Sequence, residues 1–169
     1  INIRSIINIL PKINNPPGRL QKINYKKKKS KIIIDYAHTP DALARTLNSL
    51  ISNNMKPSLV FGCGGDRDKK KRKLMGIIAD KNTNRTYITD DNPRHEDPSK
   101  IRKSIIKYCR KAIEIPDRRK AIKKAIKDLK NNEILLIAGK GHETVQIYKD
   151  KTVKFDDYQI VKNIIKNEY

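Results

Sequence analysis

The chain has 169 residues, 37% of them hydrophobic, which is typical of one globular domain with a core of its own. Its formal net charge of +21 raises the question of a nucleic-acid partner. No apolar run approaches the length of a membrane span, and the two cysteines lack the spacing of a disulfide framework or a zinc site.

The positive charge comes with a compositional bias. Lys, Ile and Asn number 28, 27 and 15, and Lys outnumbers Arg by 28 to 11. All three have A/T-rich codons, so the drift of a genome toward A and T explains the excess without a partner. Aromatic residues are only 5% and no nucleic-acid module is recognisable, so we favour a solvated basic face. A module that binds nucleic acid or another polyanion stays as the alternative.

The chain begins with a short helical pattern that ends in a cluster of Asn, Pro and Gly at 14–18. Such a cluster marks a linker or a domain boundary. The first residues show neither an initiator methionine nor a signal peptide, so we expect the chain to be part of a longer polypeptide. We divide it into residues 1–16, a tail with its linker, and residues 17–169, one domain.

From residue 32 onward, short apolar strands alternate with helices. The expected strands lie at 32–34, 59–61, 87–89, 113–115 and 135–137, followed by a hairpin that pairs 145–148 with 152–155. Thr39, Asp97 and Asp117 are expected to cap helices, and further helices are expected near 73–81 and 158–165. This alternation predicts an α/β, Rossmann-like fold, with a mostly parallel sheet and helices on both faces.

Polar motifs follow four of the expected strands. They are DYAH at 35–38, GCGGDR at 62–67, DDNPR at 90–94 and GKGHE at 139–143. In α/β folds of this kind, ligands bind beyond the carboxyl ends of the strands. The four motifs therefore predict one active face.

The motifs at 62–67 and 90–94 suit charged ligands. Three glycines at 62–65 let backbone N–H groups approach an anion, although a tight turn is the plain reading, and Arg67 favours the anion. At 90–94, carboxylates suit an ammonium group, and Arg94 suits a carboxylate through two parallel hydrogen bonds. That combination fits a zwitterionic amino acid, and a polar turn explains it about as well when it is taken alone.

The remaining candidates are single polar residues. In the 139–143 loop, Glu143 suits an ammonium group and His142 a general base, although a loop histidine bonded to backbone is the commoner case. Asp35 ends a strand where many α/β proteins hold a ribose hydroxyl, and Arg19 is placed to reach a phosphate. The histidines lack metal-ligand spacing, so we predict no metal held by these residues.

Five motifs together resemble the carboxyl-terminal part of the Mur ligase family, in its diaminopimelate-adding branch. They are PGR at 17–19, DYAHTPDAL at 35–43, FGCGGDRD at 61–68, DDNPR at 90–94 and AGKGHE at 138–143. They occur in the family's order, and the similarity spans the chain from about residue 17. The resemblance implies part of an ATP-dependent amide ligase of peptidoglycan synthesis. Such a ligase joins meso-diaminopimelate to UDP-N-acetylmuramoyl-L-alanyl-D-glutamate through an acyl phosphate.

The resemblance also implies roles for individual residues. The implied contacts with meso-diaminopimelate are Arg67, Asp91, Asn92, Pro93, Arg94, Gly139 and Glu143. Arg94 takes the carboxylate at the far end of the amino acid, which lysine lacks. The implied contacts with ATP are Arg19, Asp35 and His38.

The same resemblance indicates what lies elsewhere. In the family, the phosphate-binding loop and the Mg²⁺ ligands belong to a central domain, of which residues 1–16 resemble the tail. We therefore expect ATP and Mg²⁺ to be held mainly there, and this chain alone to be inactive. We expect a cytoplasmic monomer with UDP-MurNAc-dipeptide, meso-diaminopimelate and ATP as partners, and no membrane. A folylpolyglutamate-type ligase is an alternative that DNPR speaks against.

Overall fold

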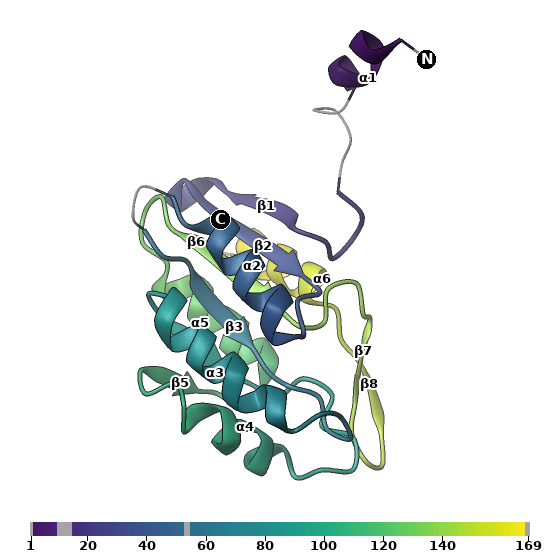
Figure 1. Cartoon of the computed structure of the whole chain (residues 1–169), viewed down its shortest axis with the longest axis vertical. Coiled ribbons are helices and arrows are strands. Elements are labelled where there is room, and N and C mark those ends of the chain that lie inside the picture. The colour runs from purple at the N-terminus through teal and green to yellow at the C-terminus, as the bar shows by residue number, and fades with distance from the viewer. Residues whose placement is uncertain (1, 10–14, 53–54, 168–169) are drawn as a thin grey trace.

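The structure, a computed structural model, describes residues 2–9, 15–52 and 55–167 (Figure 1). Its centre is a six-stranded sheet in the order β1-β2-β6-β3-β4-β5. These strands are β1 (Gln21–Tyr25), β2 (Ser30–Asp35), β3 (Ser58–Phe61), β4 (Thr86–Ile88), β5 (Ala112–Glu114) and β6 (Ile134–Ala138). Only the β1-β2 pair is antiparallel, so the prediction of an α/β fold with a mostly parallel sheet is confirmed.

Helices cover both faces of this sheet, as Figure 1 shows. They are α2 (Pro40–Leu50), α3 (Lys70–Asn82) and α4 (Pro98–Ile106) on one face, and α5 (Arg118–Asp128) and α6 (Asp157–Lys166) on the other. Along β2, Ile32 and Ile34 pack toward α5 and α6, whereas Ile33 packs toward α2 and α3. Burial on both faces explains why the central strands read as unbroken apolar runs.

The predicted helix caps are present. The side chain of Thr39 accepts a hydrogen bond from the backbone N–H of Ala42, and Pro40 follows it as the first residue of α2. Asp97 caps α4 and Asp117 caps α5 in the same way. Since each cap lies directly after a strand end or loop, it determines where the chain turns back along the sheet.

The edge strand β1 was missing from the predicted elements. It pairs with β2 so that Gln21 lies opposite Ile34, and only Ile23 and Tyr25 of its five residues are buried. Two apolar positions are too short a pattern to distinguish a strand from a loop. Because β1 runs antiparallel to β2, its beginning brings residues 18–20 next to the carboxyl end of β2.

Two smaller features complete the fold. The hairpin of β7 (Val145–Ile147) and β8 (Thr152–Lys154) forms a separate two-stranded sheet, as predicted, and η2 (Lys26–Lys28) links β1 to β2. The helix α1 (Ile3–Ile9) lies away from the sheet in Figure 1, and the predicted breaker cluster at 14–18 is described only from residue 15. Among the described residues, no helix has both the length and the apolar character needed to cross a membrane.

A buried ion pair joins the first residues of α5 and α6. The Nε and Nη2 of Arg118 donate to the two carboxylate oxygens of Asp157 at 2.9 and 2.7 Å, and neither side chain has exposed area. The Nη2 also donates to the carbonyl of Ala138, the last residue of β6, at 3.0 Å. The pair thus holds both helices of one face against the strand that leads into the 139–143 loop.

We expect Arg118→Met to lower the free energy of unfolding by about 3–5 kcal/mol, because it leaves the Asp157 carboxylate buried without its cation. Urea denaturation followed by circular dichroism measures the loss. The matched control is Lys124→Met, which breaks the more exposed pair with Asp128 on the surface of α5 and should cost less than about 1 kcal/mol. Equal losses in the two variants would show that burial of the Arg118 pair carries no special weight.

Candidate functional site

The four polar motifs meet at one edge of the sheet, beyond the carboxyl ends of β2, β3, β4 and β6. Glycines show how closely they approach. A Cβ on Gly65 would lie 1.9 Å from the carbonyl oxygen of Pro93, and one on Gly139 would lie 2.8 Å from Oδ2 of Asp91. The glycine loop at 62–65 and the 139–143 loop therefore both pack against DNPR, and larger side chains at these glycines would separate them.

Asn92 lies at the centre of this packing and is only 3% exposed. Its Oδ1 accepts hydrogen bonds from Nζ of Lys140 at 2.8 Å and from the backbone N–H of Ile147 at 3.0 Å. Its Nδ2 donates to Oε2 of Glu143 at 2.9 Å, and Lys140 donates to that same oxygen at 3.0 Å. This network joins the DNPR and GKGHE segments through Asn92 and two partners that lie 48 and 51 positions away in the chain.

The network also sets the charge of Glu143. Burial favours the neutral carboxyl, but the hydrogen bond and positive charge of Lys140, with help from Asn92 and Arg94, hold the pKa of Glu143 below its ordinary value. The side chain is about one-third exposed, so it is an anion that faces solvent on one side. Such a carboxylate can accept hydrogen bonds from an ammonium group.

Arg94 takes a left-handed backbone conformation, with φ of 52°, that aims its side chain at the glycine loop. Its Nη1 donates to the carbonyl of Gly65 at 2.9 Å, and a Cβ on Gly64 would lie 2.8 Å from that nitrogen. In the part of the chain that the structure describes, its Nε and Nη2 have no hydrogen-bond partner. The Cγ of Arg67 also lies near Gly64, 3.9 Å from the position of such a Cβ, and the Arg67 side chain is exposed.

The β7–β8 hairpin supports DNPR from outside the main sheet. Gln146, which is 4% exposed, donates from Nε2 to the carbonyls of Asp91 at 2.7 Å and Asp90 at 3.3 Å. The backbone N–H of Arg94 donates to the carbonyl of Ile147 at 3.1 Å. Sequence reasoning missed Gln146 and Lys140 as supports, and no local pattern distinguishes them, because their partners lie 48–56 residues away.

The residues predicted for a nucleotide lie at the carboxyl end of β2. The carboxylate of Asp35 is buried and accepts from the backbone N–H groups of Leu20 at 2.8 Å and Ala37 at 2.9 Å, and from the hydroxyl of Thr46. It therefore joins the PGR segment to the end of β2. Its Oδ1 accepts two of these hydrogen bonds and its Oδ2 accepts one, so Oδ2 keeps a lone pair for a ligand hydroxyl.

Around Tyr36 lies a group of planar side chains. The guanidinium of Arg19 lies 4.6 Å from the centre of the Tyr36 ring, and the rings of His38 and His142 lie 4.5 and 5.4 Å from it. Gly18 makes the assembly possible, because a Cβ there would lie 2.1 Å from the backbone nitrogen of His142. The structure thus brings Arg19, Asp35 and His38 together, with the GKGHE loop between them and DNPR.

The glycine loop is held from behind by Arg72, which is 4% exposed. Its Nη1 and Nη2 donate to the two carboxylate oxygens of Glu96 at 3.0 and 2.8 Å, and the backbone N–H of Asp66 donates to the same carboxylate at 2.7 Å. The hydrogen bonds from Arg72 lower the pKa of Glu96 to about 2. The pair ties α3 to the segment that precedes α4.

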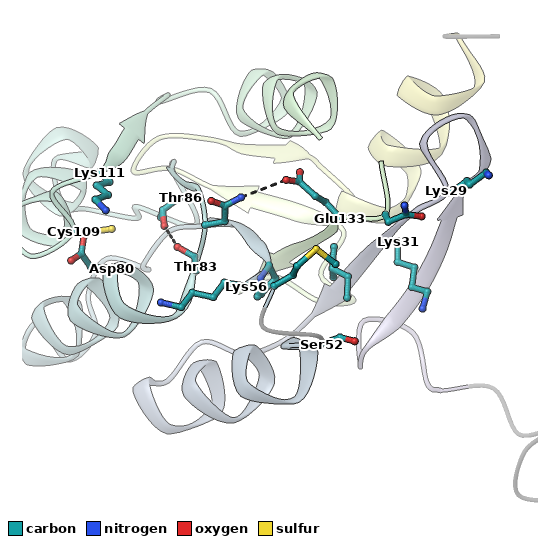
Figure 2. Close-up of a pocket in the computed structure, with 15 residues that line it drawn as sticks. Lys29, Lys31, Ser52, Lys56, Asp80, Thr83, Thr86, Cys109, Lys111 and Glu133 are labelled. Atoms are coloured by element: carbon teal, nitrogen blue, oxygen red, sulfur yellow. Dashed lines mark hydrogen bonds between the residues drawn. The ribbon is translucent and has the colours of Figure 1, made fainter. Parts of the chain in front are cut away.

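Cavities lie both near the candidate site and far from it. One of about 680 Å³ lies at the amino-terminal ends of the strands and shares no residue with the four motifs. Lys29, Lys31 and Lys56 line it, but Figure 2 shows their ammonium groups pointing in different directions. A second, of about 600 Å³, lies between residues 93–98 and 148–151 and is bordered by Arg94. Only the second adjoins the predicted amino-acid site.

Within the ranges that the structure describes, no three His, Cys, Asp or Glu residues are grouped so as to hold a metal ion. The charged and planar groups of the site can recognise a ligand of complementary charge and shape. Asp91 and Glu143 supply carboxylates, Arg67 and Arg94 lie beside Gly64, and planar side chains surround Tyr36.

Known proteins resemble this chain in sequence. The family model described as Mur ligase, glutamate ligase domain, matches residues 18–141. The UDP-N-acetylmuramoyl-L-alanyl-D-glutamate--2,6-diaminopimelate ligase of Rickettsia bellii is 49% identical over 160 residues, covering 92% of this chain and 33% of that protein. The chain thus spans about a third of the length of such curated relatives.

Solved structures also superimpose on this chain. A UDP-N-acetylmuramoyl-L-alanyl-D-glutamate--2,6-diaminopimelate ligase superimposes with a TM-score of 0.82 at 38% identity, covering 99% of this chain and 35% of that one. A folylpolyglutamate synthase from Thermotoga maritima superimposes with a TM-score of 0.60 at 22% identity, covering 82% of this chain and 31% of that one. The second likeness shows a shared fold and nothing further.

The Arg72–Glu96 pair gives a pH dependence that can be measured. Because the pKa of Glu96 falls from 4.5 to about 2 on folding, its stabilisation is complete above pH 4.5 and is lost as the pH falls toward 2. We expect Glu96→Gln to destabilise the protein at neutral pH and to flatten the fall in stability across that range. Acid unfolding followed by circular dichroism tests this. If the stability of Glu96→Gln falls with pH as steeply as that of the wild type, other carboxylates dominate acid unfolding.

Proposed function

This chain belongs to the Mur ligase family through its glutamate ligase domain, and from that premise we propose that it is the carboxyl-terminal domain of a diaminopimelate-adding ligase. The whole enzyme would join meso-diaminopimelate to UDP-N-acetylmuramoyl-L-alanyl-D-glutamate with ATP in peptidoglycan synthesis. The support comes from the names of a relative that is 49% identical and a solved structure that is 38% identical. Within the chain, the observation that carries the proposal is the position of Arg94 beside the glycine loop.

The proposed amino-acid site is a clamp for a zwitterion. Asp91 and Glu143 would receive an ammonium group, while Arg67 and Arg94 would receive carboxylates. Asn92, Pro93 and Gly139 shape the site, since Asn92 orients Glu143 and the other two let the loops approach closely. Diaminopimelate carries an amino acid group at each end, which fits a site with more than one cation.

Arg94 would select diaminopimelate over lysine. Its Nη1 is held by the carbonyl of Gly65, which fixes the guanidinium plane while Nε and Nη2 stay available in the described structure. A planar, preorganised fork matches a carboxylate with two hydrogen bonds. Lysine has no second carboxylate, so it would leave this group without a ligand partner.

The proposed nucleotide contacts lie on the other side of the GKGHE loop. Arg19 would bind a phosphate, and Asp35 would accept a hydrogen bond from a ribose hydroxyl. His38 would contact the nucleotide from its place beside Tyr36. Phosphates and Mg²⁺ would be held mainly by a preceding domain, of which residues 1–16 would be the tail.

The division of labour in the reaction follows. ATP would phosphorylate the glutamate carboxyl of the nucleotide precursor, and the amine of diaminopimelate would attack the acyl phosphate and release phosphate. This domain would position the attacking amino acid by holding it at both ends, and it would supply no group that makes or breaks bonds. We place the reaction in the cytoplasm and assign it to a monomer. A folylpolyglutamate-type acceptor fits less well, since those neighbours share only the fold.

The first test joins the chain to its upstream domains and measures ATP-dependent ligation with diaminopimelate and lysine side by side. We expect diaminopimelate to be used at least about tenfold better, which corresponds to one charge-assisted hydrogen bond of about 1.4 kcal/mol. Equal use of both amino acids would contradict the assignment of Arg94. No ligation with either one would contradict the proposed function itself.

The second test is Arg94→Ala in the same whole ligase. We expect KM for diaminopimelate to rise roughly 10- to 100-fold, the value of losing hydrogen bonds to a charged group, while KM for ATP stays within about twofold. Arg119→Ala is the matched control, since that arginine is exposed on α5. If KM for ATP rises by the same factor as KM for diaminopimelate, Arg94 stabilises the whole face and is not a specific contact with diaminopimelate.

A further inference from the structure

Behind the proposed amino-acid site lies a cation that none of the proposed contacts includes. Lys140 has no exposed area, although it stands in a glycine-flanked loop at the edge of the sheet. Lysine is almost never fully buried unless it is paired. Its Nζ donates to Oδ1 of Asn92 at 2.8 Å and to Oε2 of Glu143 at 3.0 Å, so it is paired with two of the proposed contact residues.

Lys140 and the backbone of Ile147 together determine which way the amide of Asn92 points. The Oδ1 of Asn92 faces two donors, the ammonium of Lys140 and the backbone N–H of Ile147. A flipped amide would place its NH₂ group against both donors, which is unfavourable. The Nδ2 must therefore face Glu143, to which it donates at 2.9 Å.

The orientation of Glu143 follows from the same contacts. Its Oε2 accepts from both Lys140 and Asn92, whereas Oε1 has no hydrogen-bond partner among residues 2–9, 15–52 and 55–167. One oxygen is thus used to hold the side chain, and the other is left for a ligand. Besides Lys140, the cations whose fields reach Glu143 are Arg94 from DNPR and Arg118 from α5.

We propose that Lys140 is a positioning residue for the incoming amino acid, which locks Asn92 and Glu143 in one arrangement. In that arrangement, Oε1 of Glu143 is presented to the ammonium group of an amino acid or another primary amine. The proposal rests on the proposed function, because it names what orients the same site. It assigns a role to a side chain that does not itself touch the ligand.

A role confined to holding two loops together makes different predictions. Loss of such a tie would lower stability and affect both substrates, since DNPR and the GKGHE loop also flank the nucleotide side. A positioning role changes the amino-acid step selectively, and it changes its pH dependence. Without Lys140, burial raises the pKa of Glu143, so Glu143 would become protonated, and lose its ammonium-binding form, at higher pH.

The test compares Lys140→Met and Lys140→Gln with the wild type in the whole ligase joined to its upstream domains. The methionine removes both the charge and the hydrogen bonds, and the glutamine keeps one amide donor without the charge. The control is Lys123→Met, which makes the same change on the exposed face of α5. Ligation is measured against diaminopimelate and ATP separately, over a range of pH.

We expect Lys140→Met to raise KM for diaminopimelate by more than about tenfold, and Lys140→Gln to raise it less, with KM for ATP within about twofold in both. The acid limb of kcat/KM for diaminopimelate should move to higher pH in both variants and stay unchanged in Lys123→Met. If Lys140→Met does not fold, the shift of the acid limb in Lys140→Gln decides the question.

The proposal is overturned if Lys140→Gln keeps the wild-type acid limb and KM, or if the KM values for ATP and diaminopimelate rise together. Either result leaves the proposed function intact, because the wild type still ligates diaminopimelate. If the wild type ligates no amino acid at all, the proposed function fails first, and the role of Lys140 fails with it.

Discussion

Burial of four parallel strands on both faces dictates where polar chemistry can appear in this protein. β2, β6, β3 and β4 are covered by α2 and α3 on one side and by α5 and α6 on the other, so the side chains in the middle of each strand contribute to the core. Polar groups are confined to the strand ends, and since the strands are parallel, their carboxyl ends meet at one edge. DNPR, the glycine loop, the GKGHE loop and Asp35 are neighbours for this reason. Each is far from the others along the chain.

Buried cations turn this shared edge into a defined site. Arg118 joins α5 and α6 to the end of β6, Arg72 ties α3 to the segment that precedes α4, and Lys140 links DNPR to the GKGHE loop. Each is paired with a carboxylate, as a buried charge must be. Removing one partner of such a pair costs far more than a surface pair contributes. These three contacts therefore matter more to the site than most of the net charge of +21.

The remaining positive charge lies mainly on solvent-facing lysines. Even where lysines line a common cavity, at the amino-terminal ends of the strands, their ammonium groups diverge. A binding site for a phosphate or another compact anion requires donors that converge. The exposed lysines thus fit the compositional bias of the chain better than they fit a selected anion site, whereas Nη1 of Arg94 lies beside Gly64 and donates to the carbonyl of Gly65.

The sequence by itself determined the α/β class, the central strands, the caps at Thr39, Asp97 and Asp117, and the motifs that line one edge. These features are local, because strand periodicity, capping and glycine-rich turns depend on residues close together in the chain. Only the tertiary structure decided that β1 closes the sheet, that both oxygens of Asp35 hold neighbouring backbone, and that Gln146 and Lys140 support DNPR. Those contacts join residues up to 56 positions apart, and such pairings arise from packing rather than from any local pattern.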